Sequence, residues 1–111
     1  MKNFHSSVTD LREPFHQTIF SFPYEAGWAD EAIYFITAES ATPSTAKIRL
    51  RVQLSADGLR WLDEGTVVEL TGPSSAFARV SHFGGFLRLA GDVVDDVDPS
   101  CTLTVRLALK G

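Results

Sequence analysis

Hydrophobic and polar residues alternate most regularly between residues 47 and 54, which predicts a β-strand with one buried face. Successive side chains of a strand point to opposite sides of the sheet. The expected inward set is Ile48, Leu50, Val52 and Leu54, and the expected outward set is Lys47, Arg49, Arg51 and Gln53. Asp57-Gly58 follows, and glycine accepts the positive φ that a tight hairpin turn needs. We therefore expect a hairpin here, with Trp61 anchoring the returning strand in the core.

Turn residues divide the rest of the chain into further short apolar segments. The other expected strands cover residues 18–22, 31–38, 59–62, 66–70, 76–82, 86–90 and 101–109. Residues 31–38 are apolar nearly throughout, which fits either a doubly buried strand or a short helix, and their aromatic and β-branched content favours the strand. About eight short strands without a helical period are typical of an antiparallel β-sandwich of jelly-roll type.

Composition and polarity divide the chain into a short lead-in and one domain. Residues 1–16 are polar and contain Pro14 and two of the three histidines, so we expect an N-terminal arm that is poorly ordered or used in assembly. Residues 17–111 are expected to form the β-sandwich. The length of 111 residues suits one domain, and a hydrophobic content of 44% is enough for one core.

Charge and hydropathy exclude several classes of partner. The net charge of −4 argues against a general nucleic-acid binder. No apolar run approaches the roughly 20 residues that span a bilayer, and the first residues lack the apolar segment of a secretory signal. We therefore expect a soluble protein that is cytoplasmic, or virion-associated after cytoplasmic synthesis, with no membrane or nucleic-acid partner. A single cysteine, Cys101, rules out an intramolecular disulfide.

The arginines are the first asymmetry in the sequence, because five of the seven stand at expected outward strand positions. Carboxylates instead collect in the expected loops, so the basic sheet face of one subunit could meet the acidic loops of its neighbour. Arginine suits such contacts through its planar fork of donors. The alternative is a solvated face with ion pairs worth only about 0–1 kcal/mol each. The interface candidates are Arg49, Arg51, Arg79, Arg88 and Arg106.

Aromatic residues in expected loops are candidates for a ligand platform, on which a sugar or a base could stack. Trp28 follows Gly27 in a loop and is the better candidate for an exposed tryptophan, whereas Phe83 lies in the turn His82–Phe86. The alternative for that turn is a core aromatic side chain next to two glycines that reverse the chain. The platform candidates are Tyr24, Trp28 and Phe83.

No catalytic constellation stands out, and we expect no enzyme and no cofactor. Cys101 falls on the inward side of the last strand, where a cysteine behaves as a small apolar residue. His5 and His16 lie in the expected arm, and His82 has no orienting partner nearby in the sequence. These histidines do not supply the clustered metal set of a cupin-like enzyme.

The expected loop of residues 91–100 is acidic. Its carboxylates are Asp92, Asp95, Asp96 and Asp98. Carboxylates gathered in one loop can bind Ca²⁺, but their spacing does not match the alternating Asp-x-Asp-x-Asp-Gly pattern, and valines interrupt them. The interpretation favoured by this spacing is an acidic, soluble loop, so we expect no metal site.

Several of these segments together resemble a known class of domain. The segments are Val52–Trp61, Phe77–Val80, Phe86–Leu89 and Leu103–Leu107. They resemble small jelly-roll domains of phage and phage-like virion proteins, including capsid-decoration and tail-associated modules, and more weakly discoidin-like carbohydrate-binding modules. The resemblance covers roughly residues 45–110, and its motifs encode hairpin geometry and core pattern, so it implies sandwich architecture more than any one function. No ligand residue of these families carries over.

A lone domain of this kind most often binds or assembles. The first hypothesis is a non-enzymatic structural module that forms homo-oligomers and decorates or stabilises a larger assembly. The alternative is a carbohydrate- or other ligand-binding β-sandwich that uses the aromatic platform.

Overall fold

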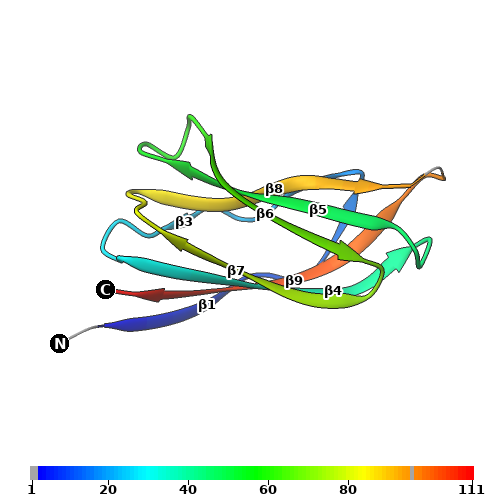
Figure 1. Cartoon of the computed structure of the whole chain (residues 1–111), viewed down its shortest axis with the longest axis horizontal. Coiled ribbons are helices and arrows are strands. Elements are labelled where there is room, and N and C mark those ends of the chain that lie inside the picture. Colours follow the sequence, from blue (N-terminus) through cyan, green and yellow to red (C-terminus); the bar gives the residue numbers. More distant parts are fainter. Residues whose placement is uncertain (1–2, 96) are drawn as a thin grey trace.

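The computed structural model describes residues 3–95 and 97–111, which form two antiparallel β-sheets packed face to face (Figure 1). Sheet A contains β1 (Phe4–His16), β9 (Ser100–Lys110), β4 (Glu31–Thr42) and β7 (Ser74–Ser81), in that order. Sheet B contains β2 (Thr18–Phe20), β8 (Phe86–Val94), β5 (Lys47–Ser55) and β6 (Leu62–Thr71), and the short β3 (Tyr24–Glu25) also pairs with β8. Within these ranges no helix is long and apolar enough to cross a membrane.

The strand order is that of a jelly roll, as the sequence predicts. When the two-residue β3 is set aside, the remaining eight strands form two four-stranded sheets, β1-β9-β4-β7 and β2-β8-β5-β6. The first strand, β1, lies beside the last, β9, and β2 lies beside β8. Two Greek keys produce this order. Residues 31–38, for which a helix was the alternative, lie within β4.

β1 differs from the expected N-terminal arm. It pairs antiparallel with β9 from Phe4↔Lys110 to His16↔Ser100, with two register shifts. Residues 4–16 are therefore part of sheet A. Their polar composition hides the strand for two reasons. An edge strand needs at most one buried side, and the bulges of β1 break the regular alternation. Whether this segment also serves assembly remains a prediction.

The core lies between the two sheets and takes the inward side chains of both. Ile48, Leu50 and Val52 are fully buried as expected, but Leu54 is only half-buried and Gln53 is buried. A register shift between Arg51 and Gln53 in the β5–β6 pairing explains this change of pattern. The largest fully buried side chains are Tyr34, Ile19, Ile36, Ile48, Leu50, Leu87, Leu89, Leu103, Leu107, Leu109, Val52 and Val105.

Two polar side chains of the core are buried at the sheet A side. Asp10 is 3% exposed and accepts hydrogen bonds from Thr9 Oγ1 at 2.8 Å and from the Phe22 backbone N–H at 3.2 Å. The Tyr34 hydroxyl has no hydrogen-bond partner among the described residues. Burial raises the pKa of both groups, and for Tyr34 the charge of Asp10 adds to the effect.

Several strands are longer than expected. β6 runs through residues 63–65, and β8 continues to Val94, which shortens the expected loop of residues 91–100. Gly91 permits this extension, because a Cβ atom there would lie 1.9 Å from the Arg49 carbonyl oxygen of β5.

The two ends of the described chain lie side by side (Figure 1). The Gly111 N–H donates to the Asn3 carbonyl oxygen at 2.9 Å, and the Asn3 N–H donates to the Gly111 carbonyl. This pairing continues the β1–β9 ladder to its end.

Candidate functional site

The five candidate arginines are divided between the two outer faces. Arg79 of β7 and Arg106 of β9 stand on sheet A, whereas Arg49 and Arg51 of β5 and Arg88 of β8 stand on sheet B. They do not form the single basic face that the sequence suggests. Alternation shows which side of a strand is outward, but it does not show to which sheet the strand belongs.

On sheet A, the strand register brings apolar and basic side chains into one exposed row. Val8 pairs with Arg106, Arg106 with Phe35, and Phe35 with Phe77. Phe35 is 45% exposed and Phe77 is 55% exposed. The Arg79 guanidinium lies 5.4 Å from the centre of the Phe77 ring. We call the surface formed by Val8, Ile33, Phe35, Phe77, Arg79 and Arg106 the sheet A patch.

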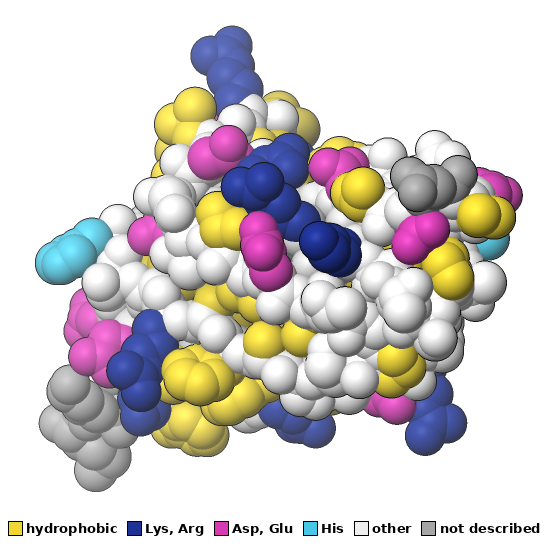
Figure 2. Space-filling view, turned by 45° about the vertical axis from the view of Figure 1, so that its right-hand side comes forward, with side chains coloured by type: hydrophobic (Ala, Val, Ile, Leu, Met, Phe, Trp, Pro, Cys, Tyr) yellow, Lys and Arg dark blue, Asp and Glu magenta, His cyan; other side chains and the backbone are white. Residues whose placement is uncertain are grey.

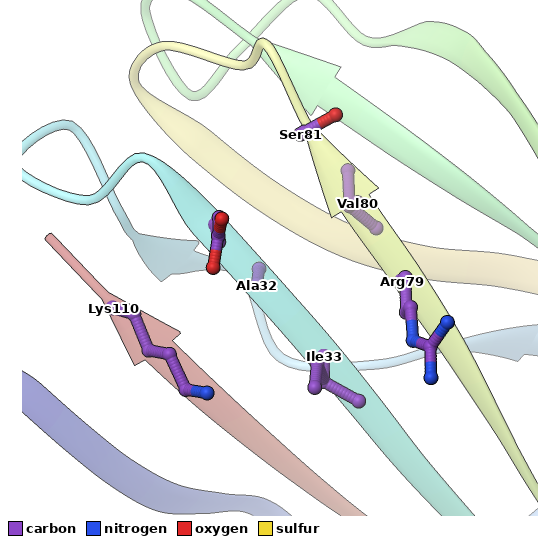
Figure 3. A pocket seen from close by; sticks show the side chains of 7 residues that line it. Ala32, Ile33, Arg79, Val80, Ser81 and Lys110 are labelled. Carbon is purple, nitrogen blue, oxygen red and sulfur yellow. The ribbon is translucent and has the colours of Figure 1, made fainter.

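An open groove of about 440 Å³ continues this patch across β9, β4 and β7 (Figure 3). Figure 3 shows Ile33 between the side chains of Lys110 and Arg79, while Ala32 and Val80 point to the other side of the sheet. Figure 2 shows hydrophobic side chains gathered beside a basic one at the lower left, on the sheet A side of the molecule. Within the described residues, neither Arg79 nor Arg106 has a carboxylate partner.

On sheet B, by contrast, the arginines belong to a polar network. Arg51 Nε and Gln53 Nε2 both donate to Asp63 Oδ1, at 3.1 Å and 2.9 Å. Arg88 Nε donates to Gln53 Oε1 at 2.8 Å. The hydrogen bond from Gln53, supported by the charge of Arg51, lowers the pKa of Asp63. Arg49 pairs with Glu69 at 3.6 Å.

Arg88 is held between two aromatic rings. Its guanidinium lies 4.7 Å from the Phe20 ring centre and 4.3 Å from that of Trp61. Partial burial lowers the pKa of Arg88, with Arg51 adding to the effect, but an arginine remains charged in proteins. The expectation that Trp61 is a core residue is wrong, because its half-buried ring packs on Arg88 at the outer face.

The loop that carries Trp61 is built around Asp57. Asp57 Oδ1 accepts hydrogen bonds from the backbone N–H groups of Leu59 at 2.8 Å and Arg60 at 2.9 Å, and from Ser55 Oγ at 3.0 Å. These bonds, led by that from Arg60, lower the pKa of Asp57. Gly58 has the expected positive φ of 79°. The connection is longer than a tight hairpin, however, because β6 begins only at Leu62.

Two of the three platform candidates come together. Tyr24 and Trp28 line a cleft with Asn3, Phe4 and His5. The Tyr24 hydroxyl lies 2.8 Å from His5 Nε2, and the two rings stack with centres 6.1 Å apart. Trp28 is 43% exposed, as expected. Phe83 is not part of this cleft and packs, partly buried, against the core.

Sequence reasoning missed Phe20 and Trp61 as a pair. The alternating pattern around Phe20 predicts a short strand but not its neighbours. Only the register Phe20↔Ala90 between β2 and β8 places Phe20 beside Arg88. The available signal in the sequence was the loop Ser55–Trp61, which ends on a tryptophan.

The candidate nucleophile, Cys101, is buried in β9. Burial raises the pKa of the Cys101 thiol to about 11, so the thiolate is scarce at neutral pH. Residues 3–95 and 97–111 contain no group of three or more His, Cys, Asp or Glu side chains that could hold a metal ion. Of the acidic residues, Asp92 lies on β8 rather than in a loop, and Asp96 lies outside the described residues.

Comparison with known proteins identifies the fold. No protein-family model and no curated protein sequence matches the chain. Among solved structures, the SPBc2 prophage-derived protein YomS is similar with a TM-score of 0.63 and 11% identity, over 100% of this chain and 96% of that chain.

A chain of infectious bursal disease virus, strain Gt, is similar with a TM-score of 0.59 and 9% identity, over 98% of this chain and 32% of that chain. The CBM36-1 domain of a multidomain xylanase from the hindgut metagenome of Trinervitermes trinervoides has a TM-score of 0.55 and 8% identity, with 96% of each chain covered. At such identities the likeness shows the fold alone. The chain is a small β-sandwich of jelly-roll type, and its structural neighbours include the phage and carbohydrate-binding classes to which the sequence bears a resemblance.

Proposed function

We propose that this protein is a non-enzymatic assembly module that associates with copies of itself through the sheet A patch. The observation that carries the proposal is the pairing of two exposed phenylalanines with two arginines that have no carboxylate partner among residues 3–95 and 97–111. Contiguous apolar surface on a soluble domain marks interaction sites. Aromatic residues and arginine are the residue types enriched at protein interfaces.

Charge explains why a second copy is a suitable partner. The whole chain carries a net charge of −4, so a basic patch on one copy is attracted to acidic surface on the next. Asp92, for example, is exposed on β8 of sheet B, away from the patch. A contact between two different surfaces is heterologous, and it closes into a ring or continues into a filament. The shared fold of a prophage-derived protein and a virus is compatible with such a role.

Removal of the N-terminal segment is a poor test of assembly. Deleting residues 1–16 would remove all of β1 from sheet A, so weaker assembly could reflect damage to the fold. Single substitutions on the two outer faces are cleaner. Phe77→Glu places a charge in the sheet A patch, and Val67→Glu is its control because Val67 is 47% exposed on the outer face of sheet B.

The experiment measures solution mass by light scattering on a size-exclusion column at low and high salt. We expect the wild-type protein to form a defined oligomer that loosens in high salt, because salt screens arginine–carboxylate contacts. Phe77→Glu should weaken association at least about tenfold, and Val67→Glu should leave it unchanged. A wild-type monomer at both salt concentrations, or equal masses for the two variants, would contradict the proposal.

The alternative function, ligand binding, remains a proposal for the Tyr24–Trp28 cleft. It is better supported on sheet B, where the guanidinium of Arg88 packs against the rings of Phe20 and Trp61.

A further inference from the structure

We infer that the outer face of sheet B carries a carboxylate-binding site centred on Arg88, with the chemistry to take a uronic-acid sugar. The site lies on the opposite side of the sandwich from the sheet A patch, so it is independent of the proposed self-association. Its parts are the ring-enclosed guanidinium, the hydrogen-bond network that orients it, and exposed aromatic side chains on β2 and just after it.

The guanidinium of Arg88 is fixed before any ligand arrives. Phe20 and Trp61 cover it at 4.7 Å and 4.3 Å. Its Nε donates to Gln53 Oε1, and Gln53 is itself 8% exposed and bonded to Asp63. A side chain that contacts two rings and is hydrogen-bonded at Nε has lost most of its rotamer freedom already. Binding an anion therefore costs little further ordering.

Arg88 also lacks the partner that its neighbours have. Arg49 pairs with Glu69 and Arg51 with Asp63, but within the described part of the chain no carboxylate pairs with Arg88. With Nε engaged by Gln53, the terminal nitrogens remain available to a ligand. Arginine binds a carboxylate through two parallel hydrogen bonds, and partial desolvation strengthens such a pair.

The surroundings select the kind of carboxylate. Phe20 is 50% exposed beside the guanidinium, and Phe22, two residues further along the chain, is 64% exposed. Aromatic surface of this kind packs against the C–H face of a sugar ring. The exposed carboxylate of Asp63 lies in the same network and can accept a hydrogen bond from a hydroxyl group, so a sugar acid uses all three features.

The test is titration of the Trp28→Phe variant with trigalacturonate, followed by tryptophan fluorescence. Trp61 is then the tryptophan that remains, so a change in emission reports on the proposed site. We expect saturable binding that weakens as salt is added. A neutral trisaccharide of galactose should bind at least about tenfold more weakly, since it lacks the carboxylates that pair with Arg88.

Matched arginine variants locate the site. In the same Trp28→Phe background, Arg88→Gln should reduce affinity for trigalacturonate at least about tenfold, whereas Arg79→Gln on sheet A should not change it. Circular dichroism checks that each variant keeps its fold. Phe20→Ala removes one ring and leaves the charge of Arg88 in place, and this variant should also bind trigalacturonate more weakly.

Five outcomes would overturn the inference. The first is absence of binding when wild type and Trp28→Phe are both titrated by calorimetry. The next three are equal affinity for the neutral sugar, unchanged affinity in Arg88→Gln, and equally tight binding of triglutamate. The last result would assign the site to acidic peptide instead. Binding by wild type that is lost in Trp28→Phe would move the ligand to the Tyr24–Trp28 cleft. Self-association is measured separately, and Phe77→Glu should still bind trigalacturonate.

Discussion

The outer faces of the two sheets carry the same residue types in different arrangements. On sheet B, Arg51 and Arg88 are joined through Asp63 and Gln53 into one network. On sheet A, Arg79 and Arg106 stand beside exposed phenylalanines without a carboxylate partner among the described residues. An outward arginine therefore has no fixed role. Its neighbours across the strands decide whether it joins a hydrogen-bond network, as on sheet B, or stands beside apolar side chains, as on sheet A.

The largest expected difference between the faces concerns their polar contacts. Gln53→Ala removes the partner of Arg88 Nε and a hydrogen bond to Asp63, so we expect a loss of about 1–3 kcal/mol in the free energy of unfolding. On sheet A, Thr37→Ala removes an exposed hydrogen bond to Ser75 of 3.1 Å, and its loss should stay within about 0.5 kcal/mol. Urea unfolding at low protein concentration measures both, and equal losses would remove the distinction.

A smaller difference is expected for the arginine–aromatic contacts. Phe20→Ala and Phe77→Ala each delete a half-exposed ring beside an arginine, at 4.7 Å and 5.4 Å. Phe20→Ala should cost about 1 kcal/mol, because Arg88 is already held in place, whereas Phe77→Ala should cost less than about 0.5 kcal/mol in a dilute monomer. Thermal unfolding of the pair is the measurement, and a larger loss for Phe77→Ala would reverse the comparison.

The smallest expected effect is on the pH dependence of stability. One carboxylate on each sheet has a shifted pKa, and the two shifts have opposite directions. The folded-state pKa of Asp63 is lowered, so its stabilising contribution is present above its usual pKa and is lost as pH falls through the folded value. The folded-state pKa of Asp10 is raised by burial, so its contribution is present below its usual pKa and is lost as pH rises through the folded value.

Acidification from about pH 7 to about pH 3 should therefore lower the stability of wild type relative to Asp63→Asn. The same change should raise the stability of wild type relative to Asp10→Asn. Urea unfolding across this range gives the two differences, and the prediction fails if they have the same sign.

The sequence predicted the sandwich because its strongest signals are local. Alternation at Ile48, Leu50 and Val52 identifies a strand and its buried side, and Asp57-Gly58 marks a turn. The number and spacing of the expected strands favour the jelly-roll class, although β1 was not among them. The segment 1–16 was harder to interpret, because an edge strand with bulges is held mainly by its backbone pairing with β9.

The candidate site could be predicted only in part. Trp28 was correctly expected to be exposed, and it shares a cleft with Tyr24. The position of Trp61 on Arg88 depends on the length of the loop after Ser55 and on which strand lies beside β5. Both are properties of the whole fold, which no single stretch of residues specifies.

The pairing of Asn3 with Gly111 brings the two ends of the described backbone together, so that its path is nearly closed. A short linker from Gly111 to Asn3 would join these two residues without moving any strand, since chain ends that lie close together make circular permutation tolerable. The chain could then be opened in the exposed loop after β5, between residues 56 and 60. The new termini would project beside Trp61, so a reporter or a second domain attached there would be carried on the sheet B face, away from the sheet A patch.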